Sequence, residues 1–160
     1  MNRYIVQFGL GVVFLLFSIL AAWYEGAEIV DSPFEWKYST PFSGEVLQAS
    51  DISRLDYFVY AAKFKPAFPI VMAISSSYLL VMAGHYFLKN RKCFFTLYVS
   101  VIAASLLILG WAMVSSTTSG ARALSYVLLS GGGICVLIIL VNLFALYDRR
   151  FLPNLQRRTK

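Results

Sequence analysis

The sequence predicts an all-α membrane protein, a bundle of four transmembrane helices with a sizeable segment between the first two. The chain has 160 residues, of which 59% are hydrophobic and 14% charged. Soluble domains have about 45–50% apolar and about 25% charged residues. Four apolar runs reach the roughly 20 residues that a helix needs to cross a bilayer. At this length we expect one membrane domain that covers residues 1–160.

The four predicted spans cover residues 4–23, 66–88, 94–115 and 123–147. Lipid offers no hydrogen-bond partners to the backbone, so apolar runs of this length predict helices. The second span contains Pro66 and Pro69 in its first turn, where the missing N–H groups cost little.

The first span has a second interpretation, as a signal peptide. Arg3 precedes its apolar run, and the small residues Ala21 and Ala22 lie near its end. The run is too long for a typical signal peptide, and the bulky Trp23 and Tyr24 follow the alanines. We therefore expect this segment to be retained as a transmembrane helix.

The charges of the connecting segments predict the orientation. The segments on one side of the spans carry nine basic residues and one acidic residue, whereas those on the other side carry five basic and seven acidic residues. Short segments rich in Lys and Arg stay in the cytoplasm. We expect both termini, the 89–92 turn and a tail of residues 148–160 inside, and residues 24–65 outside the plasma membrane. The inner basic residues are Arg3, Lys89, Arg91, Lys92, Arg149, Arg150, Arg157, Arg158 and Lys160.

This charge distribution predicts contact with membrane lipids and no nucleic-acid partner. Basic residues next to transmembrane helices are attracted to anionic lipid headgroups. The sequence has no basic helix of the kind that reads a nucleic-acid groove, and no platform of interleaved aromatic and basic residues on which bases could stack.

The outer segment begins with a pattern typical of a short β-hairpin. Aromatic residues alternate with charged ones over residues 34–38, which predicts a strand. Thr40–Pro41 and Ser43–Gly44 supply turn residues, and residues 45–47 could return as the partner strand. An isolated hairpin is marginal in water, so we expect this one to lean on an apolar surface.

The rest of the outer segment predicts an amphipathic helix at the membrane interface. Ser50 or Asp51 can cap it, and Pro66 bounds it. Apolar residues recur at helical spacing on one face, namely Ile52, Leu55, Val59 and Ala62. Three roles stay open for this helix: a lid on the bundle, a docking surface for a partner, or part of a ligand site.

Two groups of residues are candidates for interaction. The first is the apolar and aromatic set of the outer segment, namely Phe34, Trp36, Tyr38, Phe42, Leu55, Tyr57, Phe58 and Tyr60. The second is the glycine run Gly131, Gly132 and Gly133 in the fourth span. Small residues let a neighbouring helix approach closely, whether it belongs to the same bundle or to a partner.

The sequence predicts no catalytic residue, no cofactor and no metal site, and hence no enzyme. Cys93 and Cys135 lack CxxC spacing, and their different depths disfavour a disulfide. The acidic residues are scattered without the pattern of a calcium loop. His85 is the ionisable residue within the spans and lies near the inner interface, where it could anchor the helix, pack, or handle protons.

Two stretches of the outer segment resemble a small family of Bacillus membrane proteins, the YjdJ-like proteins. They are residues 34–43, FEWKYSTPFS, and residues 51–66, DISRLDYFVYAAKFKP. The resemblance implies a multi-pass plasma-membrane protein of a Gram-positive bacterium. It implies no activity and no catalytic residues, and it points to the outer segment as the distinctive part.

Two functional hypotheses follow. The leading one is an accessory or assembly subunit that works by protein interaction, with a membrane-protein partner or a second copy of the chain. It is motivated by a bundle without internal charges that carries an aromatic-rich outer segment. The alternative is a transporter or lipid-handling protein that uses the space between the outer segment and the bundle.

Overall fold

The computed structural model describes the backbone of residues 2–158 and the side chains of residues 3–145. Every regular element within that range is helical, which confirms the all-α class. The α-helices are α1 (Asn2–Gly26), α2 (Pro33–Ser39), α3 (Arg54–Phe64), α4 (Ala67–Leu88), α5 (Lys92–Val114) and α6 (Ser119–Arg158). Two short 3₁₀ helices, η1 (Ala27–Asp31) and η2 (Ala49–Asp51), lie between them.

Four helices are long and apolar enough to cross a membrane, as predicted. The qualifying stretches are Arg3–Asp31, Ala67–Leu88, Lys92–Val114 and Ser119–Ala145. The last helix, α6, continues to Arg158, so the backbone expected as a separate tail is helical at least to that residue. The basic side chains of that tail, Arg149, Arg150, Arg157, Arg158 and Lys160, lie outside the described side chains.

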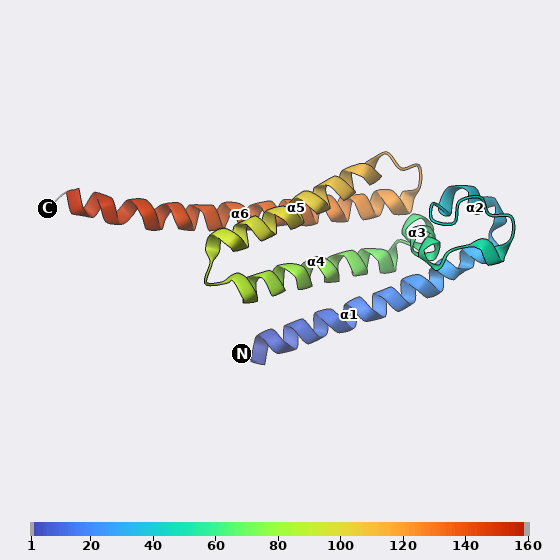
Figure 1. The fold of residues 1–160 in the computed structure, drawn as a ribbon, viewed down its shortest axis with the longest axis horizontal. Coiled ribbons are helices and arrows are strands. Elements are labelled where there is room, and N and C mark those ends of the chain that lie inside the picture. Colours follow the sequence, from blue (N-terminus) through green and yellow to red (C-terminus); the bar gives the residue numbers. More distant parts are fainter. Residues whose placement is uncertain (1, 159–160) are drawn as a thin grey trace.

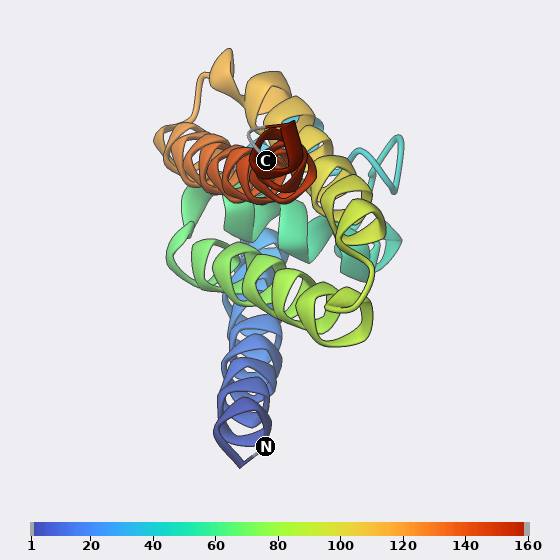
Figure 2. The ribbon, with the colours of Figure 1, turned by 90° about the vertical axis from the view of Figure 1, so that its left-hand side faces the viewer.

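The four long helices form an open stack. Helix α1 packs along α4, α5 packs along α6, and α4 also contacts both α5 and α6. Helix α1 has no comparable contact with α5 or α6, and Figure 2 shows it on the far side of α4 from them. Both ends of the described chain lie at the end of the stack that is opposite to α2 and α3 (Figure 1).

Residues 27–65 form a compact cap on the other end of the stack. Within it, α3 runs across the ends of the long helices (Figure 1) and packs against α1, α4 and α6. The helix predicted before Pro66 is therefore present. It begins one turn later than expected, because the Oγ atom of Ser53 accepts the N–H of Leu55 at 3.3 Å.

The predicted β-hairpin is wrong. Residues 34–38 lie in α2, residues 45–47 form no strand, and no strand occurs in the backbone from 2 to 158. Pro33 occupies the first helical turn, where its fixed φ angle suits a helix. The hydroxyl of Thr40 closes the helix by donating to the Trp36 carbonyl at 2.7 Å. The chain does turn at residues 41–43, next to Gly44, which has a φ of 73°, but this turn joins no strands.

Candidate functional site

The cap has its own small apolar core. Ile29, Ile52 and Tyr60 are buried in it, and Trp36 and Tyr57 pack against them half-buried. The indole N–H of Trp36 donates to the carbonyl of Ile29 at 2.7 Å, which ties α2 to η1. Of the residues predicted as an interaction surface, Trp36, Tyr57 and Tyr60 therefore hold the cap together.

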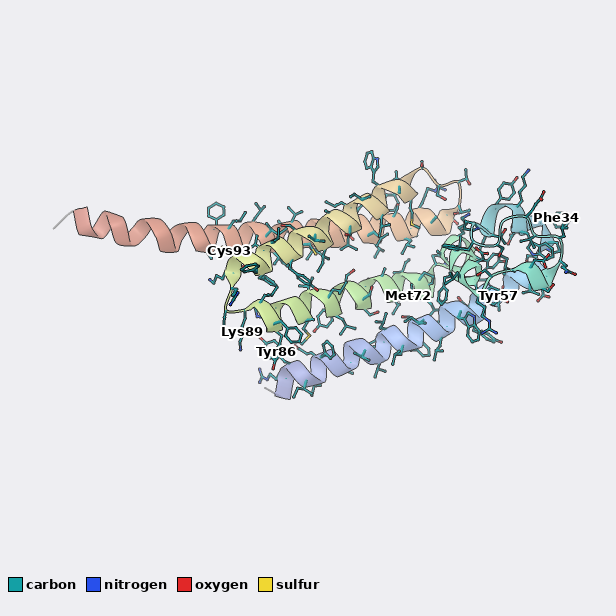
Figure 3. The ribbon with its side chains drawn as sticks, in the orientation of Figure 1. Phe34, Tyr57, Met72, Tyr86, Lys89 and Cys93 are labelled. Atoms are coloured by element: carbon teal, nitrogen blue, oxygen red, sulfur yellow. The ribbon has the colours of Figure 1, made fainter. Side chains whose placement is uncertain are left out.

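Other members of that predicted surface point outward. Phe34 is 95% exposed and Tyr38 is 67% exposed, and the two lie one helical turn apart on α2. We call this pair the α2 face. Figure 3 shows Phe34 at the outermost part of the cap, whereas Tyr57 lies lower, beside the end of α1. Phe42 and Leu55 are also exposed, and Phe58 is half-buried.

A buried carboxylate connects the cap loop to α3. Asp56 has no exposed surface, and its Oδ1 atom accepts the backbone N–H of Phe42 at 3.0 Å. Its Oδ2 atom accepts the hydroxyl of Ser43, and the Oγ atom of Ser43 in turn accepts the N–H of Ser53. Asp56 therefore holds residues 42–43 against the first turn of α3.

Two glycines allow other helices to meet the backbone of α3. A methyl group added at Gly26, the last residue of α1, would collide with the carbonyl of Tyr57. One added at Gly120, in the first turn of α6, would collide with the carbonyl of Lys63. Helix α3 is thus held between the end of α1 and the start of α6, through contacts that only glycine permits.

Two polar side chains of α2 are incompletely satisfied. The Oε2 atom of Glu35 and the Oγ atom of Ser39 are buried without a hydrogen-bond partner. Burial raises the pKa of Tyr60 above its usual value, and the carboxylate of Glu35 raises it further, so this phenol keeps its proton. At the edge of the cap, a hydrogen bond and ion pair with Glu28 at 3.0 Å raise the pKa of Lys65.

An open apolar groove separates the cap from the α5–α6 turn. Its volume is about 520 Å³, within the range of about 300–1,000 Å³ that is usual for ligand pockets. Leu55, Phe58, Val59 and Ala62 of α3 form one wall, which matches most of the helix face predicted from sequence. The remaining lining residues are Phe42, Lys63, Ala112, Met113, Ser116 and Ala121.

The glycine run of α6 is split between two environments. Gly132 is buried against Leu107 of α5, where an added methyl would lie 2.7 Å from a leucine carbon. Gly131 has ordinary van der Waals space beside Leu106, and Gly133 faces open space. In the described chain, Gly132 is therefore the member that serves the α5–α6 contact.

The end opposite the cap carries the basic α4–α5 turn. Figure 3 shows Tyr86, Lys89 and Cys93 there, at the far end of the molecule from Phe34. His85 is exposed, and its ring packs edge-to-face on Phe95 at a centroid distance of 5.6 Å. Cys93 is exposed and Cys135 is buried. Among the residues searched, no three His, Cys, Asp or Glu side chains gather closely enough to hold a metal ion.

Sequence reasoning missed the residues that assemble the cap. No sequence pattern indicated a structural role for Asp56, Gly26 or Gly120. Their roles depend on contacts between segments far apart in the chain, such as Gly120 with Lys63. The one local signal was the position of Asp56 in the first turn of α3, where a carboxylate also suits the helix dipole.

The family comparisons match the half of the chain that contains α1, the cap and α4. Residues 5–88 match the model of a family described as a domain of unknown function, DUF4306. The chain is also 35% identical, over 82 residues, to a Bacillus subtilis (strain 168) protein called "Uncharacterized protein YjdJ". That alignment covers 48% of this chain and 75% of the relative. No solved structure matches the chain.

The matched region includes both stretches on which the YjdJ-like resemblance rests, and it ends with α4, before the α5–α6 hairpin. The predicted resemblance is therefore confirmed, and the chain belongs to the DUF4306 family, as a distant homologue of YjdJ.

Proposed function

We propose that the chain is a multi-pass plasma-membrane protein with both termini in the cytoplasm and the cap on the outer face. Its four long apolar helices and the common location of its two ends support this topology (Figure 1). Lys89, Arg91 and Lys92 mark the α4–α5 turn as the cytoplasmic end.

We further propose that it acts as an accessory or assembly subunit, through a protein that docks on the α2 face. The observation that carries this proposal is the exposure of Phe34, 95%, at the part of the cap farthest from the basic turn (Figure 3). Exposed apolar side chains on the long helices face lipid, whereas those of the α2 face would project into water. Contiguous exposed aromatic residues mark protein interfaces, where such residues are enriched.

The first test is photo-crosslinking in cells, with benzoylphenylalanine at position 34. We expect a discrete crosslinked product, either with a membrane-protein partner or with a second copy of the chain. The same amino acid at Leu137 is the control, because this side chain is also exposed but lies on α6 within the apolar stretch. Equal crosslinking patterns from both positions would contradict specific docking on the cap.

The second test combines Phe34→Ala with Tyr38→Ala. Both side chains are exposed, so their loss should leave the fold intact while it weakens the crosslink from a probe at Lys37, an exposed residue of α2, several-fold. Trp36 and Tyr57 are unsuitable for this purpose, because changing either disturbs the core of the cap. An unchanged crosslink in the double variant would overturn the α2 face as the docking surface.

A further inference from the structure

The groove between α3 and the α5–α6 turn lies at the level where a bilayer changes from hydrocarbon to headgroups. Ala112 and Met113, in the last turn of α5, form part of its wall. Trp111 is adjacent to them and is 75% exposed. Tryptophan is enriched at the membrane–water interface, so its position marks that depth on the outside of the stack.

A cation without an ion-pair partner lies on the rim of this groove. Lys63 donates one hydrogen bond to the carbonyl of Tyr38, and no carboxylate among the described side chains lies within ion-pair distance of it. Lys65, two residues later, differs in that it pairs with Glu28. The nearby carboxylate of Asp56 is buried and engaged by Phe42 and Ser43.

A second cation extends from the neighbouring helix. Arg122 is exposed and follows Ala121, which lines the groove, and it has no carboxylate partner among the described side chains. The close contact of Gly120 with the Lys63 carbonyl brings the first turn of α6 against the end of α3. The groove therefore combines an apolar wall with one cation in its lining, Lys63, and a second cation, Arg122, directly follows a lining residue on the adjoining helix α6.

We propose that this groove binds one anionic glycerophospholipid of the outer leaflet. An acyl chain lies against Val59, Ala62 and Met113, and the phosphate interacts with Lys63 and Arg122. The bilayer supplies such a molecule at the depth of the groove, and the charges of the rim favour an anionic headgroup over a zwitterionic one. The choice of leaflet rests on the proposed topology, but the lipid site is independent of protein docking on the α2 face.

The test is native mass spectrometry of the full chain, released from nanodiscs that contain equal amounts of phosphatidylglycerol and phosphatidylcholine with identical acyl chains. We expect one retained lipid per chain, with phosphatidylglycerol preferred. Lys63→Gln should reduce this preference about fivefold, since one basic residue near the lipid surface is lost. Ala112→Phe should fill the groove and reduce the retention of both lipids.

Matched controls separate the groove from general effects. Lys37→Gln removes an exposed lysine of α2, and Ala104→Phe adds the same ring to an exposed position of α5, and neither residue lines the groove. Both controls should retain lipid as the parent does. Circular dichroism and thermal unfolding show whether each variant is folded. If Lys63→Gln does not fold, the parent protein is measured at raised salt instead. Salt screens the attraction between the cations and the headgroup, because the Debye length falls from about 10 Å at 0.1 M to about 3 Å at 1 M.

Two results would overturn the inference. Equal lipid retention by Ala112→Phe and Ala104→Phe would place the lipid outside the groove. A preference for phosphatidylglycerol that survives both Lys63→Gln and high salt would exclude recognition by the cations. Neither result bears on the crosslink from Phe34, so failure of the lipid site and failure of the docking proposal are distinguishable.

Discussion

At the scale of single residues, the buried Asp56 joins the loop of the cap to α3. A fully buried carboxylate is costly unless hydrogen bonds replace its water. Here the backbone N–H of Phe42 and the hydroxyl of Ser43 supply them. The same two bonds hold the irregular segment between α2 and η2, which has no regular structure of its own to position it.

We expect Asp56→Ala to destabilise the cap by about 1–3 kcal/mol, the usual cost of leaving buried donors without a partner. Asp56→Asn keeps one acceptor oxygen and should cost less. Denaturant unfolding, followed by Trp36 fluorescence in a Trp23→Phe, Trp111→Phe background, measures the change within the cap. Glu45→Ala, which changes an exposed acid of the same loop, is the control. If the Asp56→Ala and Glu45→Ala variants unfold at the same denaturant midpoint, the structural role of Asp56 is refuted.

At the scale of elements, α3 determines how the cap sits on the long helices. It is only 11 residues long, and an isolated helix of that length is marginal in water. Its stability therefore comes from packing against α1, α4 and α6. Gly26 and Gly120 make this packing close, because a side chain at either position would meet the backbone of α3.

Gly26→Ala and Gly120→Ala should each lower stability by about 1–3 kcal/mol, the typical cost of overpacking. The added methyl meets a backbone carbonyl, which cannot rotate away as a side chain can. Gly133→Ala is the matched control, because an added methyl there meets nothing within 4 Å and alanine favours a helix. Thermal unfolding in mild detergent ranks the three variants. A Gly133→Ala variant as unstable as the other two would show that loss of glycine itself, and not close approach, is responsible.

The β-hairpin prediction failed at the same scale, because residues 34–38 form a helix and not a strand. Phe34, Trp36 and Tyr38 alternate with charged residues, which fits a strand, but a helix distributes the same residues equally well. On α2, Phe34 and Tyr38 share the exposed face while Trp36 turns toward Ile29. The helix prevails because Pro33 starts it and because residues 45–47 form no partner strand.

At the scale of the whole molecule, the chain consists of the region that matches DUF4306, called here the family unit, and an additional pair of helices, α5 and α6. The DUF4306 match covers α1, the cap and α4, whereas α5 and α6 lie beyond it. The α5–α6 pair packs tightly around Val99, Ile102 and Cys135, and it meets the family unit through α3 and α4. The lipid groove lies along this junction, so it contains residues from both parts.

The proposed topology predicts which residues reagents reach from outside intact cells. In a Cys135→Ser background, the native Cys93 at the α4–α5 turn should resist a membrane-impermeant maleimide until the cells are permeabilised. With Cys93→Ser added, a cysteine introduced by Phe34→Cys should react without permeabilisation. The reverse pattern would invert the topology. Reaction of both sites in intact cells would contradict four spans with the cap and the turn on opposite sides.

The sequence by itself determined the class of the protein, because length and hydropathy are local properties that a bilayer converts directly into helices. Four helices long and apolar enough to span a membrane were predictable in this way, and local capping and turn residues predicted the helix before Pro66 and the turn near Gly44. Only the tertiary structure decided which aromatic residues of the outer segment are exposed and which are buried. That division depends on contacts between distant segments, such as Asp56 with Phe42 and Gly120 with Lys63, which no local pattern encodes.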